Sequence, residues 1–302
     1  MHPPRVVLVA LAATTAVLAS GAVGCGSSSS RSGYDTTDPT KADPTPTPTP
    51  TPTGNFNNGN PPAMPPAAEV NDVYGHSADT LFRLDPKTNA VTEIGKFSGC
   101  GPVIDIALDE SSTFYAASYM ALYTVDKKTA VCTEIASGTT YPNSLSFVPK
   151  GTVDPNAEAL VGYEDSNYVR IDVKTGAKST IGSLGAGALT SSGDIVSVKG
   201  GKSYLTVKGT SQCNTKDCLV EVDPATGKMT KNWGSIEHHN VFGLSFWGGK
   251  VYGFDEAGEL FEVTFGTSQL ATNVISIASA PAMLSFWGAG SSTSAPLVEP
   301  TK

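Results

Sequence analysis

The chain is poor in charge, and in basic side chains above all. Charged residues make up 16% of its 302 positions, and 20 Lys and Arg stand against 28 Asp and Glu, for a net charge of −8. No basic tract occurs anywhere, so the sequence lacks a surface that neutralises phosphates, and we expect no nucleic-acid partner. Apolar residues make up 39%, which is enough for a packed core and excludes disorder throughout the chain.

Long apolar runs are also missing, apart from one near the start. Residues 6–19 form an apolar stretch after Arg5, and small residues at 20–24 lead from it to Cys25. The stretch is shorter than the roughly 20 residues that a membrane-spanning helix needs. A positive residue, a short apolar run and a small-residue segment in this order predict an export signal.

Residues 1–25 resemble the signal peptide and lipobox of bacterial lipoproteins, whose motif ends on a cysteine, here Cys25. The resemblance implies that Cys25 is diacylated, palmitate being one such acyl group, and becomes the mature N-terminus. It also implies a lipid bilayer as partner and the bacterial cell envelope as location. Ala22 stands where leucine is commonest, so ordinary secretory cleavage near Gly24 is the alternative. Gly26 follows the cysteine in place of aspartate, which favours the outer over the inner membrane.

The composition changes abruptly over residues 26–66. Four consecutive serines at 27–30 are followed by alternating proline and threonine at 44–53, and then by a segment rich in Asn, Gly and Pro. Because almost no apolar side chains occur here, nothing offsets the entropy lost on ordering. We expect a disordered linker that acts as a stalk.

Helical periodicity is absent after residue 66, and one phrase recurs instead. Its copies read LFRLDPKTN, LYTVDKKTA, YVRIDVKTG and LVEVDPATG, with a degenerate fifth, LFEVTFG. The copies begin 41 to 51 residues apart, at Leu81, Leu122, Tyr168, Leu219 and Leu260. Alternation of apolar and other residues predicts a strand in each copy.

Each phrase ends in a turn that a second strand follows. Four of the copies place an aspartate at the turn, where Asx-type hydrogen bonds favour a tight hairpin, and we assign a structural role to Asp85, Asp126, Asp172 and Asp223. Two further strands precede each phrase, most clearly at residues 243–247 and 250–254. Four short antiparallel strands at this spacing are the signature of a β-propeller blade.

The two ends of the repeat region complete each other. The first unit lacks its first strand, and residues 283–288 near the C-terminus nearly copy the first strand of the last complete unit, residues 244–248. Closing a ring in this way removes exposed sheet edges. We therefore predict an all-β fold over residues 67–290, a propeller of five four-stranded blades closed by the C-terminal strand, with a disordered tail at residues 291–302.

The repeated phrase resembles the repeats of YVTN-type, NHL-type and quinoprotein-like β-propellers. The resemblance implies the architecture and leaves the function open, because the fold serves enzymes, sensors and scaffolds. The tryptophan-docking signature of quinone-binding enzymes is not present, so we expect no quinone and no other cofactor. Trp247 and Trp287, at equivalent places in the two similar strands, are expected to pack between blades.

Four cysteines remain after Cys25, in a domain expected to be exported to an oxidising compartment. Cys213 and Cys218 share a polar loop, which favours a local disulfide. Cys100 and Cys132 then pair by elimination. A metal site made of four thiolates is the weaker alternative, because the two pairs belong to different blades.

In propellers, the loops that enter the first strands and those that join second to third strands form one face, over which ligands generally bind. That face gives the candidate ligand residues Asp105, Tyr141, Asn143, His238, His239 and Asn240, and we add Trp233, near a fourth strand, as a side chain that stacks on a sugar. Adjacent histidines rarely aim at one ion, so we interpret residues 237–240 as solvated. We assign no metal or catalytic residue; Ca²⁺ is the ion that the acidic loops would take.

These observations favour a non-enzymatic recognition or scaffold lipoprotein that binds an envelope protein or glycan. A metal-assisted hydrolase or lactonase is the first alternative, and it requires Asp105, Asn143 and residues 238–240 to converge on one point. A structural subunit of an envelope assembly is the second, and it requires a hydrophobic patch on the disc.

Overall fold

The structure is a computed structural model, and it describes residues 72–278 and 280–301. The predicted signal peptide, Cys25 and the predicted linker lie outside the described residues. Among the residues described, no helix is long and apolar enough to cross a membrane.

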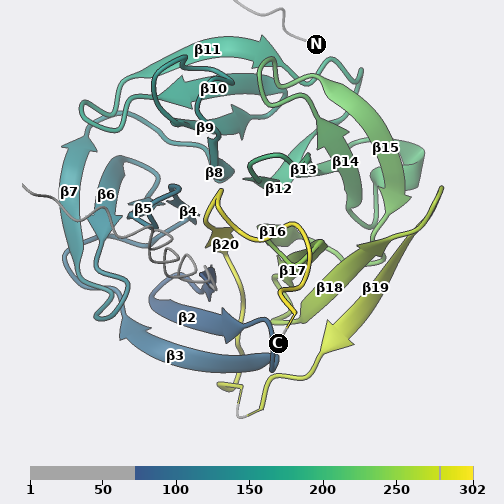
Figure 1. Cartoon of the computed structure of the whole chain (residues 1–302). Helices are drawn as coiled ribbons and strands as arrows, with labels where there is room; N and C mark the ends of the chain where they lie inside the picture. Colours follow the sequence, from purple (N-terminus) through teal and green to yellow (C-terminus); the bar gives the residue numbers. More distant parts are fainter. Residues whose placement is uncertain (1–71, 279, 302) are drawn as a thin grey trace, which may run out of the picture. The chain divides into compact units, whose positions relative to one another are not determined.

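Five antiparallel sheets of four strands each surround a central axis, which is the predicted propeller ring (Figure 1). Blade 1 contains β20 (Gly288–Ser291), β1 (Val73–His76), β2 (Thr80–Asp85) and β3 (Ala90–Lys96). Blade 2 contains β4 (Asp105–Leu108), β5 (Phe114–Ala117), β6 (Ala121–Val125) and β7 (Cys132–Ser137). Blade 3 contains β8 (Leu145–Val148), β9 (Ala159–Glu164), β10 (Asn167–Ile171) and β11 (Lys178–Ser183). Blade 4 contains β12 (Thr190–Ser197), β13 (Ser203–Lys208), β14 (Cys218–Val222) and β15 (Met229–Ser235), with the short 3-10 helix η1 (Ser211–Cys213) before β14. Blade 5 contains β16 (Val241–Trp247), β17 (Lys250–Asp255), β18 (Leu260–Phe265) and β19 (Leu270–Ile275).

The repeated phrase forms the third strand of every blade and the hairpin that follows it. Each predicted turn aspartate accepts hydrogen bonds from backbone N–H groups of its own turn, as Asp126 Oδ1 does from Lys128 (2.8 Å) and Asp223 Oδ1 from Ala225 (2.9 Å). The chain then passes through a left-handed residue, for example Gly227 at φ 70°. The structural role assigned to these aspartates is confirmed.

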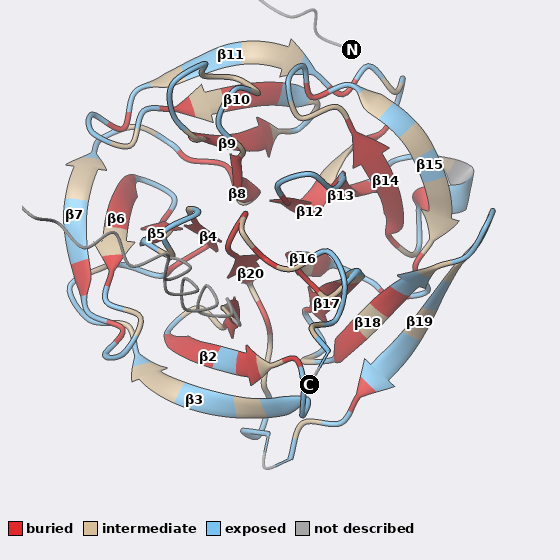
Figure 2. Cartoon of the chain, in the orientation of Figure 1, coloured by how far each residue is buried: buried red, intermediate tan, exposed pale blue. Residues whose placement is uncertain are grey.

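Burial follows the order of the strands from the axis outwards. The inner three strands of each blade are mostly buried, and the outermost strands β3, β7, β11, β15 and β19 are largely exposed or intermediate (Figure 2). Apolar side chains between neighbouring blades form the core. Trp247 is one of its largest members, in a cluster with Tyr252 and Phe286. Its predicted place between blades is confirmed.

The ring closes where β20 pairs with β1, as predicted, but the closing strand lies further along the chain than residues 283–288. Gly288 pairs with His76 in blade 1 at the position where Gly243 pairs with Phe254 in blade 5, so Gly288 is the counterpart of Gly243. Trp247 follows Gly243 whereas Trp287 precedes Gly288, and the two tryptophans are therefore not structural counterparts. The sequence similarity between the two segments was misleading because it is displaced from the pairing register. Trp287 instead precedes β20.

Both predicted disulfides are present. Cys100 bonds to Cys132, at the start of β7, and Cys213 bonds to Cys218, across the loop that precedes β14. The first bridge closes a much longer stretch of chain than the second, with sequence separations of 32 and 5 residues.

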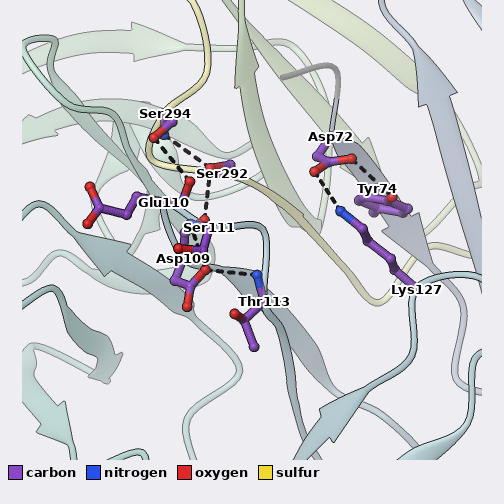
Figure 3. A network of polar contacts seen from close by, with 9 residues as sticks. All are labelled: Asp72, Tyr74, Asp109, Glu110, Ser111, Thr113, Lys127, Ser292 and Ser294. Carbon is purple, nitrogen blue, oxygen red and sulfur yellow. Dashed lines mark hydrogen bonds and ion pairs between the residues drawn. The ribbon is translucent and has the colours of Figure 1, made fainter. Parts of the chain in front are cut away.

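The segment after β20, expected to be a disordered tail, is held against the ring. Ser292 Oγ donates to the Asp109 carbonyl (2.8 Å) and Ser294 Oγ to the Glu110 carbonyl (3.3 Å), both in the β4–β5 loop (Figure 3). Backbone bonds continue from Lys199 N to the Thr293 carbonyl and from Gly248 N to the Pro296 carbonyl (both 2.8 Å).

These partners all belong to loops between first and second strands. The C-terminal segment therefore crosses the face of the ring that bears these loops (yellow in Figure 1). Thr293 and Ala295 are buried there. The expected disorder does not hold because hydroxyls and backbone groups of a Ser- and Thr-rich tail find partners in loops that are distant in sequence.

Candidate functional site

One equivalent position of the five blades meets at the axis, at the loop end opposite the C-terminal segment. It is found by following the strand pairing inwards from the first residue of the repeated phrase. In blade 2, Leu122 pairs with Ala117, which pairs with Asp105. In blade 5, Leu260 pairs with Phe254, which pairs with Gly243. The five residues at this position are Gly288, Asp105, Ser144, Asp194 and Gly243. All but the glycines bring a polar side chain to the axis.

Asp105 and Asp194 are fully buried, and their carboxyl groups are hydrogen-bonded to each other. Asp105 also accepts from the N–H of Ile106 (2.8 Å) in its own blade and from Leu145 (2.6 Å) in the next. Burial raises the pKa of both carboxyls well above the usual range, and the charge of Asp105 raises that of Asp194 further.

The second carboxyl repeats the arrangement of the first. Asp194 accepts from Ile195 N (2.6 Å) in blade 4 and from Leu244 N (2.7 Å) in blade 5. Because the two carboxyls hydrogen-bond to each other and both pKa values are raised, the pair retains a proton. Asp105, a candidate for the ligand face, is therefore a buried link between blades.

A glycine makes room for this pair. A Cβ on Gly288 would lie 2.4 Å from both Asp105 Oδ1 and His76 Nε2. His76 is fully buried, its Nδ1 lies 2.8 Å from the Ser77 carbonyl, and its Nε2 has no hydrogen-bond partner among the described residues. Burial lowers the pKa of His76 to about 4, so the ring is neutral at pH 7.

Directly outside this axial position lies a cavity of about 220 Å³, which we call the mouth cavity. Its lining residues are Ile104, Tyr119, Asn143, Phe242, Glu256 and Trp287. Four of them, from four blades, each precede the axial residue of their own strand, so the cavity sits over the axis. Three aromatic rings, an amide and a carboxylate thus share one small cavity.

The predicted candidates are dispersed around this arrangement. Asn143 lines the mouth cavity, whereas Tyr141 is buried and its hydroxyl donates to the Gly176 carbonyl (3.0 Å). Trp233 lies on the outermost strand β15, where its Nε1 donates to Glu221 Oε1 (3.0 Å).

The histidine loop, residues 237–240, was expected to be solvated; three of its residues are exposed, and the structure differs from the expectation at His238 alone. Glu237 and Asn240 both adopt left-handed backbone (φ 61° and 48°), and the two histidines between them part. His239 is exposed, while His238 is buried with its ring stacked on Phe261, the centroids 3.6 Å apart. Its Nδ1 lies 3.0 Å from Asp255 Oδ2.

Three of the five residues that a channel hydrolase would bring together have partners outside that set. Asp105 bonds to Asp194, His238 to Asp255, and Asn240 Nδ2 donates to Glu256 Oε2 (2.6 Å). His238 also belongs, with Asp255 and Glu259, to a group of potential metal ligands beside a second hollow of about 270 Å³.

Sequence reasoning missed the partner Asp194 and the aromatic lining by Phe242 and Trp287. The available signal was positional, since all three occupy strand positions equivalent to Ile104 or Asp105 in other blades. Reading that signal required the true register of β12 and β20. Tyr119, in the β5–β6 loop, carries no such signal.

Comparisons with known proteins add no functional argument. No protein-family model and no curated protein sequence matches the chain. Among solved structures, a chain of a nidogen/laminin complex is similar at TM-score 0.44 and 11% identity, covering 72% of this chain and 97% of that one. A calcium-binding regucalcin from Agrobacterium tumefaciens follows at TM-score 0.42 and 16% identity, covering 68% and 76%. Both scores are too low to bear on function, and the chain's own strand pairing identifies it as a five-bladed β-propeller.

Proposed function

We propose that this chain is a lipid-anchored recognition module of the bacterial cell envelope, and that its propeller binds a glycan at the mouth cavity. The observation that carries the proposal is the cavity itself. Equivalent positions of four blades build it, at the end of the axis that the C-terminal segment leaves uncovered. Sites at such convergent positions are where folds of this kind place ligands.

The chemistry of the lining favours a glycan over a protein surface. Tyr119, Phe242 and Trp287 offer aromatic faces of the kind that stack on the apolar face of a sugar ring. Asn143 and Glu256 offer an amide and a carboxylate to its hydroxyls. At about 220 Å³ the cavity is smaller than the roughly 300–1,000 Å³ of pockets for larger ligands, so it suits a single sugar unit of a longer chain.

The membrane anchor rests on sequence alone. The lipobox-like segment ending at Cys25 and the linker at residues 26–66 support a propeller held away from a bilayer on a stalk. Metabolic labelling with a clickable palmitate analogue tests this part. Label on the wild type that is lost in Cys25→Ser supports lipidation, and an unlabelled wild type with cleavage before or after Cys25 contradicts it.

An enrichment experiment tests the binding. The purified full chain is immobilised and exposed to cell-wall glycan fragments and detergent-solubilised envelope proteins, and the retained material is identified by mass spectrometry. The proposal predicts retained glycan that is lost in Trp287→Ala and reduced in Asn143→Ala. Trp233→Ala, on the outermost strand, is the matched control and retains it.

Two outcomes would overturn the proposal. A folded chain that retains no glycan, or one whose retention is unchanged by Trp287→Ala, excludes glycan binding at this cavity. If one protein is retained instead, and its retention depends on Trp287, the mouth cavity remains the binding site but its ligand is a protein and not a glycan. Because Trp287 is only half-buried and Asn143 lines the rim, thermal unfolding of both variants shows whether loss of binding reflects loss of folding.

A further inference from the structure

A second hollow lies between the histidine loop, residues 237–240, and the β17–β18 hairpin, and Glu256 is the one lining residue that it shares with the mouth cavity. Its volume is about 270 Å³. Its lining residues are Glu237, His238, His239, Asn240, Asp255, Glu256, Ala257 and Glu259. Four of these eight carry carboxylates and two carry imidazoles, so the hollow concentrates the groups that bind cations.

Three of these side chains are directed at one another. His238 Nδ1 lies 3.0 Å from Asp255 Oδ2 and 3.2 Å from Glu259 Oε2. Together they form the one group of three potential ligand residues within the described part of the chain, with all ligand atoms within 4.8 Å of one another. The exposed neighbour His239 is not a member.

The fold holds two of the three in place. The imidazole of His238 is stacked on Phe261 with an interplanar angle of 6°, which fixes the direction of Nδ1. Asp255 ends β17, is almost fully buried, and its Oδ1 accepts from the Glu259 N–H (2.8 Å), which turns Oδ2 towards His238. Partners that orient ligand groups in this way are typical of metal sites.

Glu259 differs, because its side chain is 51% exposed and borders the hollow. It is therefore free to adjust its distance from the other two ligands. Zinc bonds of about 2.0–2.2 Å in a tetrahedron place ligand atoms roughly 3.3–3.6 Å apart. The observed separations of 3.0 and 3.2 Å need to widen by only a few tenths of an ångström to fit.

The donor atoms of the group point to a divalent cation. The group joins one imidazole nitrogen to two carboxyl groups, a set of donors that divalent cations take in proteins. Lys216 pairs with Glu237 (2.6 Å), which also lines the hollow. Asn240, bonded to Glu256, is neutral. A nitrogen ligand beside two oxygens favours zinc over calcium, which prefers oxygen alone.

We infer that His238, Asp255 and Glu259 bind one Zn²⁺ ion, with the fourth coordination position open to the hollow. An open position is what distinguishes a site that takes water or an anionic ligand from a closed structural one. The three side chains come from the β15–β16 loop, the end of β17 and the β17–β18 loop, and none of them lines the mouth cavity.

The test is metal binding to the purified full chain after treatment with EDTA and desalting. Titration with Zn²⁺ in a calorimeter should show one ion per chain. Co²⁺, as a coloured substitute, should give the intense visible absorption of tetrahedral coordination. Zn²⁺ in excess should raise the melting temperature, since a ligand that binds only the folded state stabilises it.

Variants locate the site. Glu259→Gln, at a half-exposed side chain, is expected to fold and to weaken Zn²⁺ binding at least about tenfold. His238→Ala should abolish the Co²⁺ spectrum, and His239→Ala, in the same loop, should leave both measurements unchanged. Absence of saturable Zn²⁺ binding, equal binding by wild type and Glu259→Gln, or binding of Ca²⁺ without Zn²⁺ would each overturn the inference.

Discussion

Asp105 and Asp194 stand on opposite sides of the ring axis, in blades 2 and 4, and their buried carboxyl groups share a hydrogen bond. Each carboxyl also accepts backbone N–H groups from its own blade and from the next. Asp105 accepts a further backbone hydrogen bond from Ala289 in blade 1, so all five blades are tied to one pair of side chains. A bond between two carboxyls requires one of them to keep its proton, which links the stability of the ring to pH.

Stability should fall as the pH rises above about 6.5. The raised pKa of the pair means that the folded state holds a proton which the unfolded chain releases above about pH 4. The slope is at most about 1.4 kcal/mol per pH unit for one proton. Between about pH 4 and 6.5 the lowered pKa of His76 has the opposite effect, because there only the unfolded state protonates that ring.

Asp194→Asn isolates this contribution. The variant loses one acceptor for a buried N–H and is less stable at pH 5. It carries no carboxyl at residue 194, and its side-chain amide can donate a hydrogen bond to an ionised Asp105, so its stability should fall less steeply from pH 6.5 to 8.5 than that of the wild type. Urea unfolding across that range measures the slope, with Glu93→Gln on the exposed face of β3 as the control. Parallel slopes for wild type and Asp194→Asn would contradict the shared proton.

Gly288→Ala should destabilise the ring by about 3 kcal/mol or more. The added methyl group would lie 2.4 Å from Asp105 Oδ1 and from His76 Nε2, and neither residue has room to retreat because both are fully buried. Gly101→Ala is the control, since its Cβ would meet nothing within 4 Å. Chemical denaturation of the two variants measures the difference, and equal stability would contradict the crowded axis.

Removing residues 292–302 should lower the stability of the propeller by several kcal/mol. The truncation exposes apolar surface around the buried Ala295 and removes partners from the β4–β5, β12–β13 and β16–β17 loops. Deleting only residues 300–302 should have little effect. A truncated chain that melts at the wild-type temperature would show that the segment does not hold to the ring.

The two disulfides should contribute unequally. By the entropy of loop closure, the bridge from Cys100 to Cys132 is worth about 4 kcal/mol and the bridge from Cys213 to Cys218 about 2 kcal/mol. Paired Cys→Ala replacements, compared by guanidinium unfolding under non-reducing conditions, measure both. The reverse order would show that effects other than loop length dominate.

The strands and turns that could be predicted from the sequence are those that neighbouring residues determine. The phrase that begins at Leu81, Leu122 and its later copies alternates in period two and ends on hairpin residues, so the third and fourth strands of each blade were predictable. Ring closure followed from counting strands. The closing strand was predicted too early in the chain, because residues 284–287 match residues 244–247 in sequence. The strand that closes the ring, Gly288–Ser291, consists of small residues that fit the crowded axis but give no repeat signal.

The site was less predictable, because it depends on contacts between distant parts of the chain. Nothing local marks Asp194 as the partner of Asp105, or Phe261 as the surface that buries His238. The tail after Ser291 is composed like a disordered segment, and only the loops across which it lies give it order.

Binding of glycans to the full chain and to Trp287→Ala tests the central claim most directly. Wild type, Trp287→Ala and Trp233→Ala are applied to an array of bacterial cell-wall glycans at equal concentration. The account predicts a defined set of glycans bound equally by wild type and Trp233→Ala, with signals at least about tenfold lower for Trp287→Ala, because an aromatic wall of the cavity is lost. Equal signals for all three folded proteins would contradict recognition at the mouth cavity, and so would an array on which the folded wild type binds nothing.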